Sequence, residues 1–279
     1  MTNATTRQVP LRWLNYLLMI VVGAIVVVPL FWLVTSALKP SAEIYRWPLT
    51  WIPSRPEWSN FIDAWNAAPF AKFFLNSTIV TVIGAAIKLV LALTTAYAFV
   101  FLRFPAKNIL FLVMLGALMV PGHVTLLVNY LTVSDLGWIN TYAGLIVPGV
   151  ASVLGTFLLR QYMMTIPKEL VEAATMDGAG HLRILLTLIV PLARPTIITV
   201  AMIAIIDDWN SFIWPLIVTN TVDMRTLPVG LLYLKDNEGF NNWGAIMAGT
   251  TMVAVPILIL FFIAQRYVVA GLTQGAVKG

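Results

Sequence analysis

Residues 14–38 read LNYLLMIVVGAIVVVPLFWLVTSAL and contain no charged side chain over 25 positions. A helix needs about 20 mostly apolar residues to cross the hydrocarbon core of a bilayer. The stretch also exceeds the apolar region of a cleaved signal peptide, which is about 7–15 residues long, and no small-residue cleavage site follows it. We therefore expect a membrane-spanning helix that stops at Lys39-Pro40.

Five further apolar stretches follow along the chain, at 73–102, 108–131, 142–159, 195–220 and 243–265. Each is far longer than a buried strand and none alternates strictly, which argues against a β-barrel. We therefore predict an all-α membrane protein with six transmembrane helices. Pro121-Gly122-His123 is expected to interrupt the third stretch, and Pro215 is expected to kink the fifth.

The composition of the 279 residues supports a membrane protein, because 59% are hydrophobic and only 10% are charged. Soluble domains carry roughly 25% charged residues. The 17 cations form no stripe or patch, so no nucleic-acid partner is expected. The chain has no Cys, and His123 and His181 lie far apart, so no metal site is expected. It also has no phosphate-binding G-x-x-x-x-G-K-[ST] loop, so no cofactor is expected in this chain.

The charges between the stretches predict the orientation, because Lys and Arg are retained on the cytoplasmic side. Six spans place both termini on one side. The connections on that side carry ten cations and three acids, whereas those on the other side carry six cations and seven acids. We expect a multi-pass protein of the bacterial cytoplasmic (inner) membrane with both termini in the cytoplasm.

The longest cytoplasmic connection, 160–194, contains the sequence PKELVEAATMDGAGHLRILLTLIVP at 167–191. Pro167 suits the first turn of a helix. Gly178 and Gly180 are expected to end that helix, because glycine adopts a left-handed cap without strain. A second amphipathic helix is expected from His181, with one apolar side formed by Leu182, Leu185, Leu186 and Ile189. A surface loop without a partner is the alternative interpretation.

This connection resembles a known signature. Glu172-Ala173-Ala174, three residues, Gly178, nine residues and Leu188-x-Val190-Pro191 resemble the EAA motif of permease subunits of ABC importers, which usually ends Ile-x-Leu-Pro. The resemblance implies the type I importer permease fold and a loop that docks on an ATP-binding subunit. The coupling residues that it implies are Glu169, Glu172, Ala173, Ala174, Asp177, Gly178, Pro191, Gly275 and Lys278.

Within this family, the ending 265–279 is similar to that of a maltose-type permease. Other fragments resemble the permeases of glycerol-3-phosphate and glycerophosphodiester importers, among them Arg103-Phe104-Pro105, Trp214-Pro215-Leu216 and Leu227-Pro228-Val229-Gly230. The resemblance implies a non-catalytic subunit that forms half of a pathway for a glycerol-phosphate-type solute; a di- or oligosaccharide is the alternative. It also implies a second homologous permease, two ATP-binding subunits that bind ATP and Mg, and an extracytoplasmic solute-binding protein.

The organisation that we expect has three parts. An N-terminal segment at 1–72 contains the first helix and an outside loop, a transmembrane core covers 73–267, and a cytoplasmic tail covers 268–279. The outside connection 221–242 resembles the family's loop that probes the binding protein, and a solvated loop is the alternative. Its candidate contact residues are Asp223, Arg225, Lys235, Asp236 and Glu238.

Ionisable residues inside a bilayer are costly and are by default functional candidates. Asp207 and Asp208 lie near the middle of the fifth stretch, and adjacent helical side chains point about 100° apart. With Trp209, Asn210, Trp214 and Lys88 they form a candidate substrate pathway; a structural pair with Lys88 is the alternative. Carboxylates repel a phosphate, so they favour a neutral polyol or the ammonium of glycerophosphocholine.

Two functions of other classes compete with this interpretation. An ion-coupled secondary transporter would use Asp207, Asp208 and Lys88 as a relay, but it leaves the motif at 172–191 unexplained. A membrane-embedded enzyme would need a convergent acid/base or metal constellation, and the sequence contains none.

Overall fold

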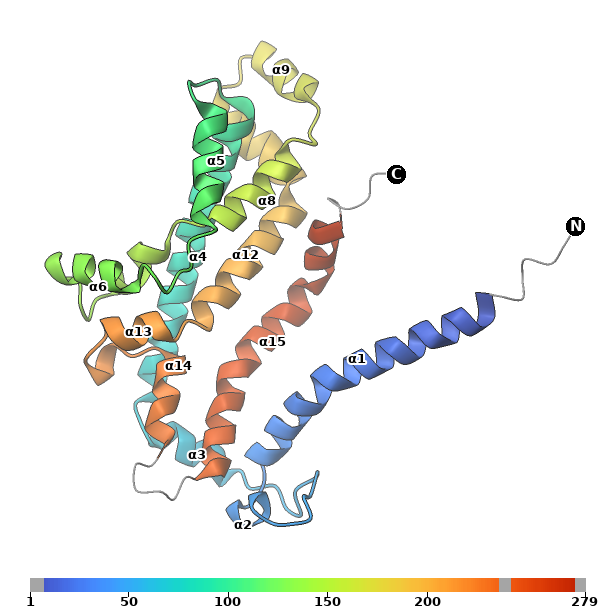
Figure 1. The fold of residues 1–279 in the computed structure, drawn as a ribbon, viewed down its shortest axis with the longest axis vertical. Helices are drawn as coiled ribbons and strands as arrows, with labels where there is room; N and C mark the ends of the chain where they lie inside the picture. The colour runs from blue at the N-terminus through green and yellow to red at the C-terminus, as the bar shows by residue number, and fades with distance from the viewer. Residues whose placement is uncertain (1–7, 236–241, 274–279) are drawn as a thin grey trace, which may run out of the picture. The chain divides into compact units, whose positions relative to one another are not determined.

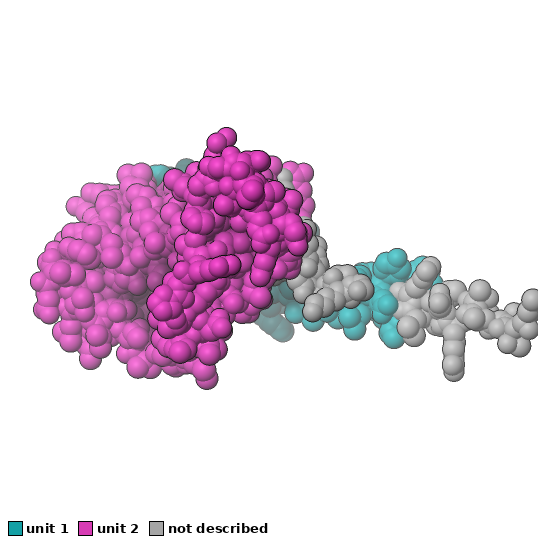
Figure 2. All heavy atoms as spheres, turned by 90° about the horizontal axis from the view of Figure 1, so that it is seen from above, with its two compact units in different colours: residues 1–68, 231–254 teal, residues 69–230, 255–279 magenta. Residues whose placement is uncertain are grey.

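The computed structural model describes residues 8–235 and 242–273, and every regular element in these ranges is a helix (Figure 1). The chain divides into two compact units (Figure 2). Unit 1 comprises Met1–Ala68 and Leu231–Ala254, and unit 2 comprises Pro69–Gly230 and Val255–Gly279. The predicted boundaries at residues 72 and 267 remain predictions.

Unit 1 contains α1 (Gln8–Ala37), α2 (Ser41–Ile44), α3 (Ser59–Asn66), η4 (Leu231–Leu234) and residues 243–254 of α15 (Trp243–Thr273). The buried Asn60 amide caps the end of α1, since its Nδ2 donates to the carbonyls of Ala37 at 3.0 Å and Lys39 at 2.9 Å. The buried Lys39 ammonium lies 3.7 Å from the centre of the Trp32 ring, and burial lowers the pKa of this amine. The helix therefore stops close to Lys39-Pro40, as expected, and the side chains of Asn60 and Lys39 hold the chain in place there.

Unit 2 is organised around one long helix, α4 (Phe70–Phe101). Two helices pack along it, α8 (Val153–Met163) and α12 (Arg194–Trp209) (Figure 1). The remaining helices of unit 2, apart from the rest of α15, are α5 (Lys107–Ala117), α6 (Leu126–Asp135), α7 (Tyr142–Ile146), η1 (Val147–Gly149), α9 (Lys168–Met176), α10 (His181–Ile184), a π-helical turn η2 (Leu185–Ile189), α11 (Val190–Leu192), α13 (Ile213–Val218), η3 (Val222–Met224) and α14 (Leu227–Gly230).

The main core of unit 2 combines small and large side chains. Ala92 and Ala96 on α4 are buried with Leu159 and Met163 on α8. Helices in a membrane approach closely where small residues face the neighbour, because dispersion contacts replace the hydrophobic driving force. Ile189, from the segment after α10, lies in the same cluster. The core therefore joins the end of the 160–194 connection directly to α4.

Three helices are long and apolar enough to cross a membrane unbroken: Trp13–Ala37, Phe70–Phe101 and Trp243–Arg266. Two bent pairs are further candidates: Tyr142–Gly149 with Val153–Met163 at 46°, and His181–Leu192 with Arg194–Trp209 at 87°. The stretch 108–131 instead begins with the 11-residue α5. The all-helical membrane fold is confirmed, and with three to five candidate spans among the described residues the number six remains a prediction.

Prolines decide where two of the predicted stretches break. A proline ring clashes with the carbonyl four residues earlier and offers no N–H, so it can kink or end a helix, although Pro29 and Pro256 lie inside α1 and α15. Helix α5 ends at Ala117, four residues before Pro121, which agrees with the interruption predicted at Pro121. In the fifth stretch the helix ends at Trp209 and resumes at Ile213. The fifth stretch is therefore broken ahead of Pro215, and the kink expected at the proline itself is replaced by this break.

The prediction of which residues form the buried side of the helix after His181 is partly wrong. Leu182 and Leu186 are exposed, whereas Leu185 and Ile189 are buried together with Ile184. The wider π-helical turn η2 rotates the chain ahead of Pro191, which cannot donate to the carbonyl of residue 187. Ile184, Leu185 and Ile189, with the partly buried Leu188, still lie about one helical turn apart, so the buried face is displaced from the predicted one.

Candidate functional site

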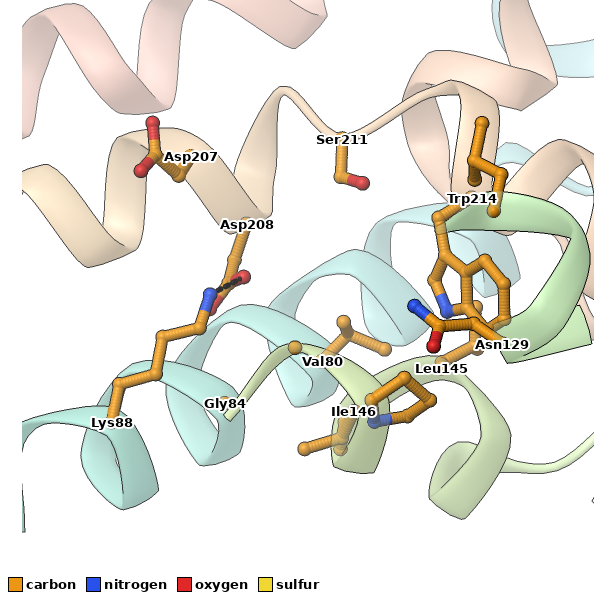
Figure 3. Close-up of a pocket in the computed structure, with 13 residues that line it drawn as sticks. Val80, Gly84, Lys88, Asn129, Leu145, Ile146, Asp207, Asp208, Ser211 and Trp214 are labelled. Atoms are coloured by element: carbon orange, nitrogen blue, oxygen red, sulfur yellow. Dashed lines mark hydrogen bonds and ion pairs between the residues drawn. The ribbon is translucent and has the colours of Figure 1, made fainter. Parts of the chain in front are cut away.

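A cavity of about 270 Å³ lies inside unit 2, where α4, α6, α7 and α12 converge. Its polar lining comes from Lys88 on α4, Asn129 on α6, Asp207 and Asp208 on α12, and Ser211 beyond α12 (Figure 3). Trp214 on α13 adds an indole, which is fixed because its Nε1 donates to the Gly144 carbonyl at 3.0 Å. The cavity thus combines carboxylate, amide, hydroxyl and aromatic groups.

Lys88 and Asp208 form an ion pair between α4 and α12, with side chains only 14% and 16% exposed (Figure 3). Gly84, one turn before Lys88, makes room for the pair. A Cβ at position 84 would lie 2.8 Å from Asp208 Oδ2. That second carboxylate oxygen is buried and has no hydrogen-bond partner among the described residues. The structural pair considered as an alternative is therefore present, and it lines the cavity.

The other candidates on α12 diverge from this pair. The Asp207 side chain leaves α12 in a different direction from Asp208 and is exposed (Figure 3). Trp209 is buried, with its ring 5.5 Å from that of Phe74. Asn210 donates to the Ile206 carbonyl at 2.8 Å and ends the helix. Lys88, Asp208 and Trp214 thus meet at the cavity, which Asp207 also lines although its side chain points another way, whereas Trp209 and Asn210 do not line it.

Sequence reasoning missed several lining residues, chiefly Gly84, Asn129 and Ser211. A polar Asn129 within the third apolar stretch was a weak signal, and Gly84 is one of 17 glycines. Neither could be joined to Asp208 from the sequence, since the contact depends on how α4, α6 and α12 pack.

The connection after α13 is anchored to α4 by buried polar side chains. Asn76 Nδ2 donates to the carbonyls of Asp223 at 2.8 Å and Arg225 at 2.9 Å, and Asn76 Oδ1 accepts from the Tyr142 hydroxyl at 2.7 Å. The Arg225 guanidinium donates to the Leu216 carbonyl at 2.8 Å, so it holds the loop internally. Asp223 pairs with Lys72 at 2.7 Å, and both are exposed.

Replacing Asn76 by alanine is expected to lower the free energy of unfolding by about 2–3 kcal/mol, since two part-buried carbonyls lose their donor. Denaturant unfolding of the purified subunit in micelles measures the change. Thr78→Ala is the matched control, because the Thr78 hydroxyl is exposed and donates to Phe74 within α4. Equal stability of the two variants would contradict the anchoring role.

The 160–194 connection folds into a corner, defined here as the α9–α10 corner (168–184). Helix α9 ends at Met176, and Gly178 adopts a left-handed φ of 80°. The Ala179 amide donates to the Ala174 carbonyl and the Gly178 amide to the Thr175 carbonyl, both at 3.0 Å. These two bonds define a Schellman cap. The predicted helix–corner–helix is confirmed, with Gly178 alone in the left-handed region and Gly180 leading into α10.

The two faces of α9 differ. Val171 and Ala174 pack on the main core of unit 2. Glu169, Glu172 and Ala173 are exposed on the other side, and Asp177 is exposed at the end of the helix. The His181 ring joins the corner to α4, because its Nδ1 lies 3.1 Å from the Tyr97 hydroxyl. The corner therefore packs on unit 2 with one face and exposes the other face to solvent or to a partner.

The remaining candidates are placed as follows. Pro191 is exposed in α11, and Lys235 is exposed after η4. Asp236, Glu238, Gly275 and Lys278 lie outside the described residues. Within residues 8–235 and 242–273 no group of three His, Asp or Glu side chains could hold a metal ion.

Known proteins share both the sequence pattern and the fold. Residues 4–274 match the family described as binding-protein-dependent transport system inner membrane component. The chain is 35% identical to the arabinooligosaccharides transport system permease protein of Halalkalibacterium halodurans, over 96% of this chain and 97% of that protein. It is 30% identical to the sn-glycerol-3-phosphate transport system permease protein of Yersinia pestis, over 92% and 94%. A bacterial ABC transporter involved in the import of alginate has a chain with a TM-score of 0.83, at 20% identity over 96% and 99%.

Proposed function

Because the chain belongs to the family of binding-protein-dependent transport system inner membrane components, we propose that its cavity lies on the solute pathway of an importer. The chain is a non-catalytic permease subunit of an ABC importer, and it acts with a partner permease, an ATPase and a binding protein. We propose one homologous partner permease and two ATPase subunits. Both termini would face the cytoplasm, as the excess of Lys and Arg on that side favours.

The charge of the cavity supports a neutral hydroxylated solute, such as an oligosaccharide. Lys88 is already matched by Asp208, so the cavity offers no free cation to a phosphate among its described lining residues. Asp207 adds a further negative charge. Asn129, Ser211 and the Trp214 ring supply the hydrogen bonds and flat apolar face that suit a sugar. This balance favours the oligosaccharide over the glycerol-phosphate-type solute that the sequence fragments favoured.

A glycerophosphodiester with an ammonium group, such as glycerophosphocholine, is the second candidate. Its cation would be attracted by the Asp207 carboxylate and by the Trp214 ring. Free sn-glycerol-3-phosphate lacks such a cation, so the same carboxylate would repel it.

Asp207→Asn is expected to raise the solute concentration for half-maximal uptake about tenfold, since a hydrogen bond to a charged group contributes about 1.5–3 kcal/mol. The measurement is initial uptake into vesicles that contain the assembled importer, with an arabinooligosaccharide, glycerophosphocholine and sn-glycerol-3-phosphate in separate arms. Asp135→Asn, at the exposed end of α6, is the matched control. Unchanged uptake in both variants would exclude Asp207 from the pathway.

The α9–α10 corner is proposed as the contact with the ATPase. Its exposed acids Glu169 and Glu172 would meet cations of that subunit, and Ala173 would allow close approach. Asp177, Pro191, Gly275 and Lys278 remain proposed coupling residues on the strength of the family motif. Asp223 and Lys235, which are exposed, are proposed as contacts of the binding protein, with Asp236 and Glu238. Arg225 is less suited, because its guanidinium is engaged within the loop.

A further inference from the structure

A second concave site lies at the opposite end of α4 from Asn76. This basic groove, of about 670 Å³, is formed by the end of α4, the turn into α5, and α9. Its cationic lining consists of Arg103, Lys107 and Lys168, and its apolar lining includes Val100, Phe101 and Val171. The groove is separate from the solute cavity, with which it shares no lining residue.

Among the described residues, the cations that line the basic groove form no ion pair. Arg103 and Lys168 are exposed, and neither forms an ion pair with a described carboxylate. Lys107 Nζ donates to the carbonyls of Val100 at 3.1 Å and Leu102 at 2.9 Å, at the end of α4. Burial, followed by the charges of Arg160 and Lys168, lowers the pKa of the Lys107 amine. Three cations thus line the groove, and Glu172 is the acid among its lining residues.

The basic groove lies at the end of α4, next to the exposed apolar side chains of α5. Phe101 is the last residue of α4, a helix long and apolar enough to cross a membrane, so the groove lies at one end of that helix. Lys107 opens α5, whose Ile109, Leu112 and Val113 are about two-thirds exposed, at 64%, 66% and 67%. A continuous apolar surface therefore runs from the cations along α5. This surface suits acyl chains, whereas a free phosphate would leave it uncovered.

We propose that the basic groove binds the phosphate of an anionic phospholipid, with the acyl chains lying along α5. A guanidinium binds phosphate through two parallel hydrogen bonds, and the two lysines add point charges. Basic pockets at the ends of membrane helices bind acidic lipid headgroups for the same reason. The bound lipid would bridge the α4–α5 turn and α9, because Arg103 lies in that turn and Lys168 is the first residue of α9. This proposal is independent of the transported solute.

The test compares lipid binding to the full-length chain by native mass spectrometry, with phosphatidylglycerol and zwitterionic phosphatidylcholine as probes. We expect at least about tenfold preference for phosphatidylglycerol and its loss in the double variant Arg103→Gln/Lys168→Gln. Arg46→Gln/Arg55→Gln removes two exposed cations from unit 1 and should keep the preference. Arg103→Lys/Lys168→Arg retains the charge and should restore most of the binding.

Four results would overturn the proposal. The first is an equal affinity for both lipids, and the second is an equal preference in the double variant and its control. The third is displacement of phosphatidylglycerol by millimolar inorganic phosphate, which would identify a free-phosphate site. In the assembled importer, release of the lipid when the ATPase is added would identify the groove as a protein interface instead. Matching melting midpoints of the variants show that folding is intact.

Discussion

Lys88→Met is expected to lower the free energy of unfolding by about 3–5 kcal/mol, because it leaves the Asp208 carboxylate buried without its cation. The Asp208 side chain is 16% exposed and its Oδ2 already lacks a described partner, so few groups are available to compensate. The Asp208 carboxylate cannot move closer to α4, because it already lies against the backbone of Gly84. Asp208→Leu is expected to be similarly destabilising through the unpaired ammonium.

The double variant Lys88→Met/Asp208→Leu is expected to recover most of the loss, because neither charge then remains in the helix interface. Replacing a buried pair with apolar residues is often neutral or stabilising. Denaturant unfolding in micelles of the unmodified protein, the two single variants and the double variant completes a double-mutant cycle. The coupling free energy between Lys88 and Asp208 should exceed about 2 kcal/mol.

The chain offers a matched control for this cycle. Lys72 and Asp223 form an ion pair at 2.7 Å on the same unit, but their side chains are 48% and 70% exposed. Solvent screens such a pair, so Lys72→Met is expected to cost about 1 kcal/mol or less. If Lys88→Met costs no more than Lys72→Met, the Lys88–Asp208 pair is not a structural element of the helix interface.

Gly178→Val is expected to abolish coupled uptake while leaving the subunit inserted in the membrane. A β-branched residue at a φ of 80° is strained, and the left-handed conformation costs roughly 1–2 kcal/mol for an L-residue. A Cβ at position 178 would meet no atom within 4 Å, so the strain is confined to the backbone. Relief of that strain breaks the Schellman cap and re-aims α9.

ATP hydrolysis and uptake by the reconstituted importer, measured together, test this prediction. Hydrolysis should continue while uptake falls at least about tenfold, equivalent to about 1.4 kcal/mol of lost coupling. Gly178→Asn should recover part of the uptake, because asparagine tolerates the left-handed region better. Gly180→Ala is the matched control, since Gly180 has a φ of −71° and open space around it. Normal uptake in Gly178→Val would refute the coupling role of the corner.

The predictions that succeeded depend on short-range rules. An apolar run in a bilayer becomes a helix, because no other local structure satisfies its backbone groups there. Gly178 ends α9 because glycine adopts a positive φ without strain. The interruption at Pro121 follows from the missing N–H of proline. Each of these outcomes is decided within a few residues along the chain.

The expectations that failed or stayed incomplete depend on packing. The apolar side at 182–189 was assigned to the wrong face, because packing against α4 and α8 buries Ile184, Leu185 and Ile189. Trp209 was expected on the solute pathway, but it is buried against Phe74. The neighbouring Asp207 stays exposed at the cavity. A rotation of α12 by one residue exchanges such positions, and the composition of α12 does not specify that rotation.

The sequence by itself determined that this is an all-helical membrane protein with a corner at Gly178, and its spaced motif pointed to the importer permease family. Only the tertiary structure decided that Lys88 pairs with Asp208, a residue 120 positions away, and that Asn129 and Gly84 share their cavity. The physical reason is the range of the interactions. Helix formation and capping are local, whereas an ion pair or a cavity exists only after separate helices have packed in one register.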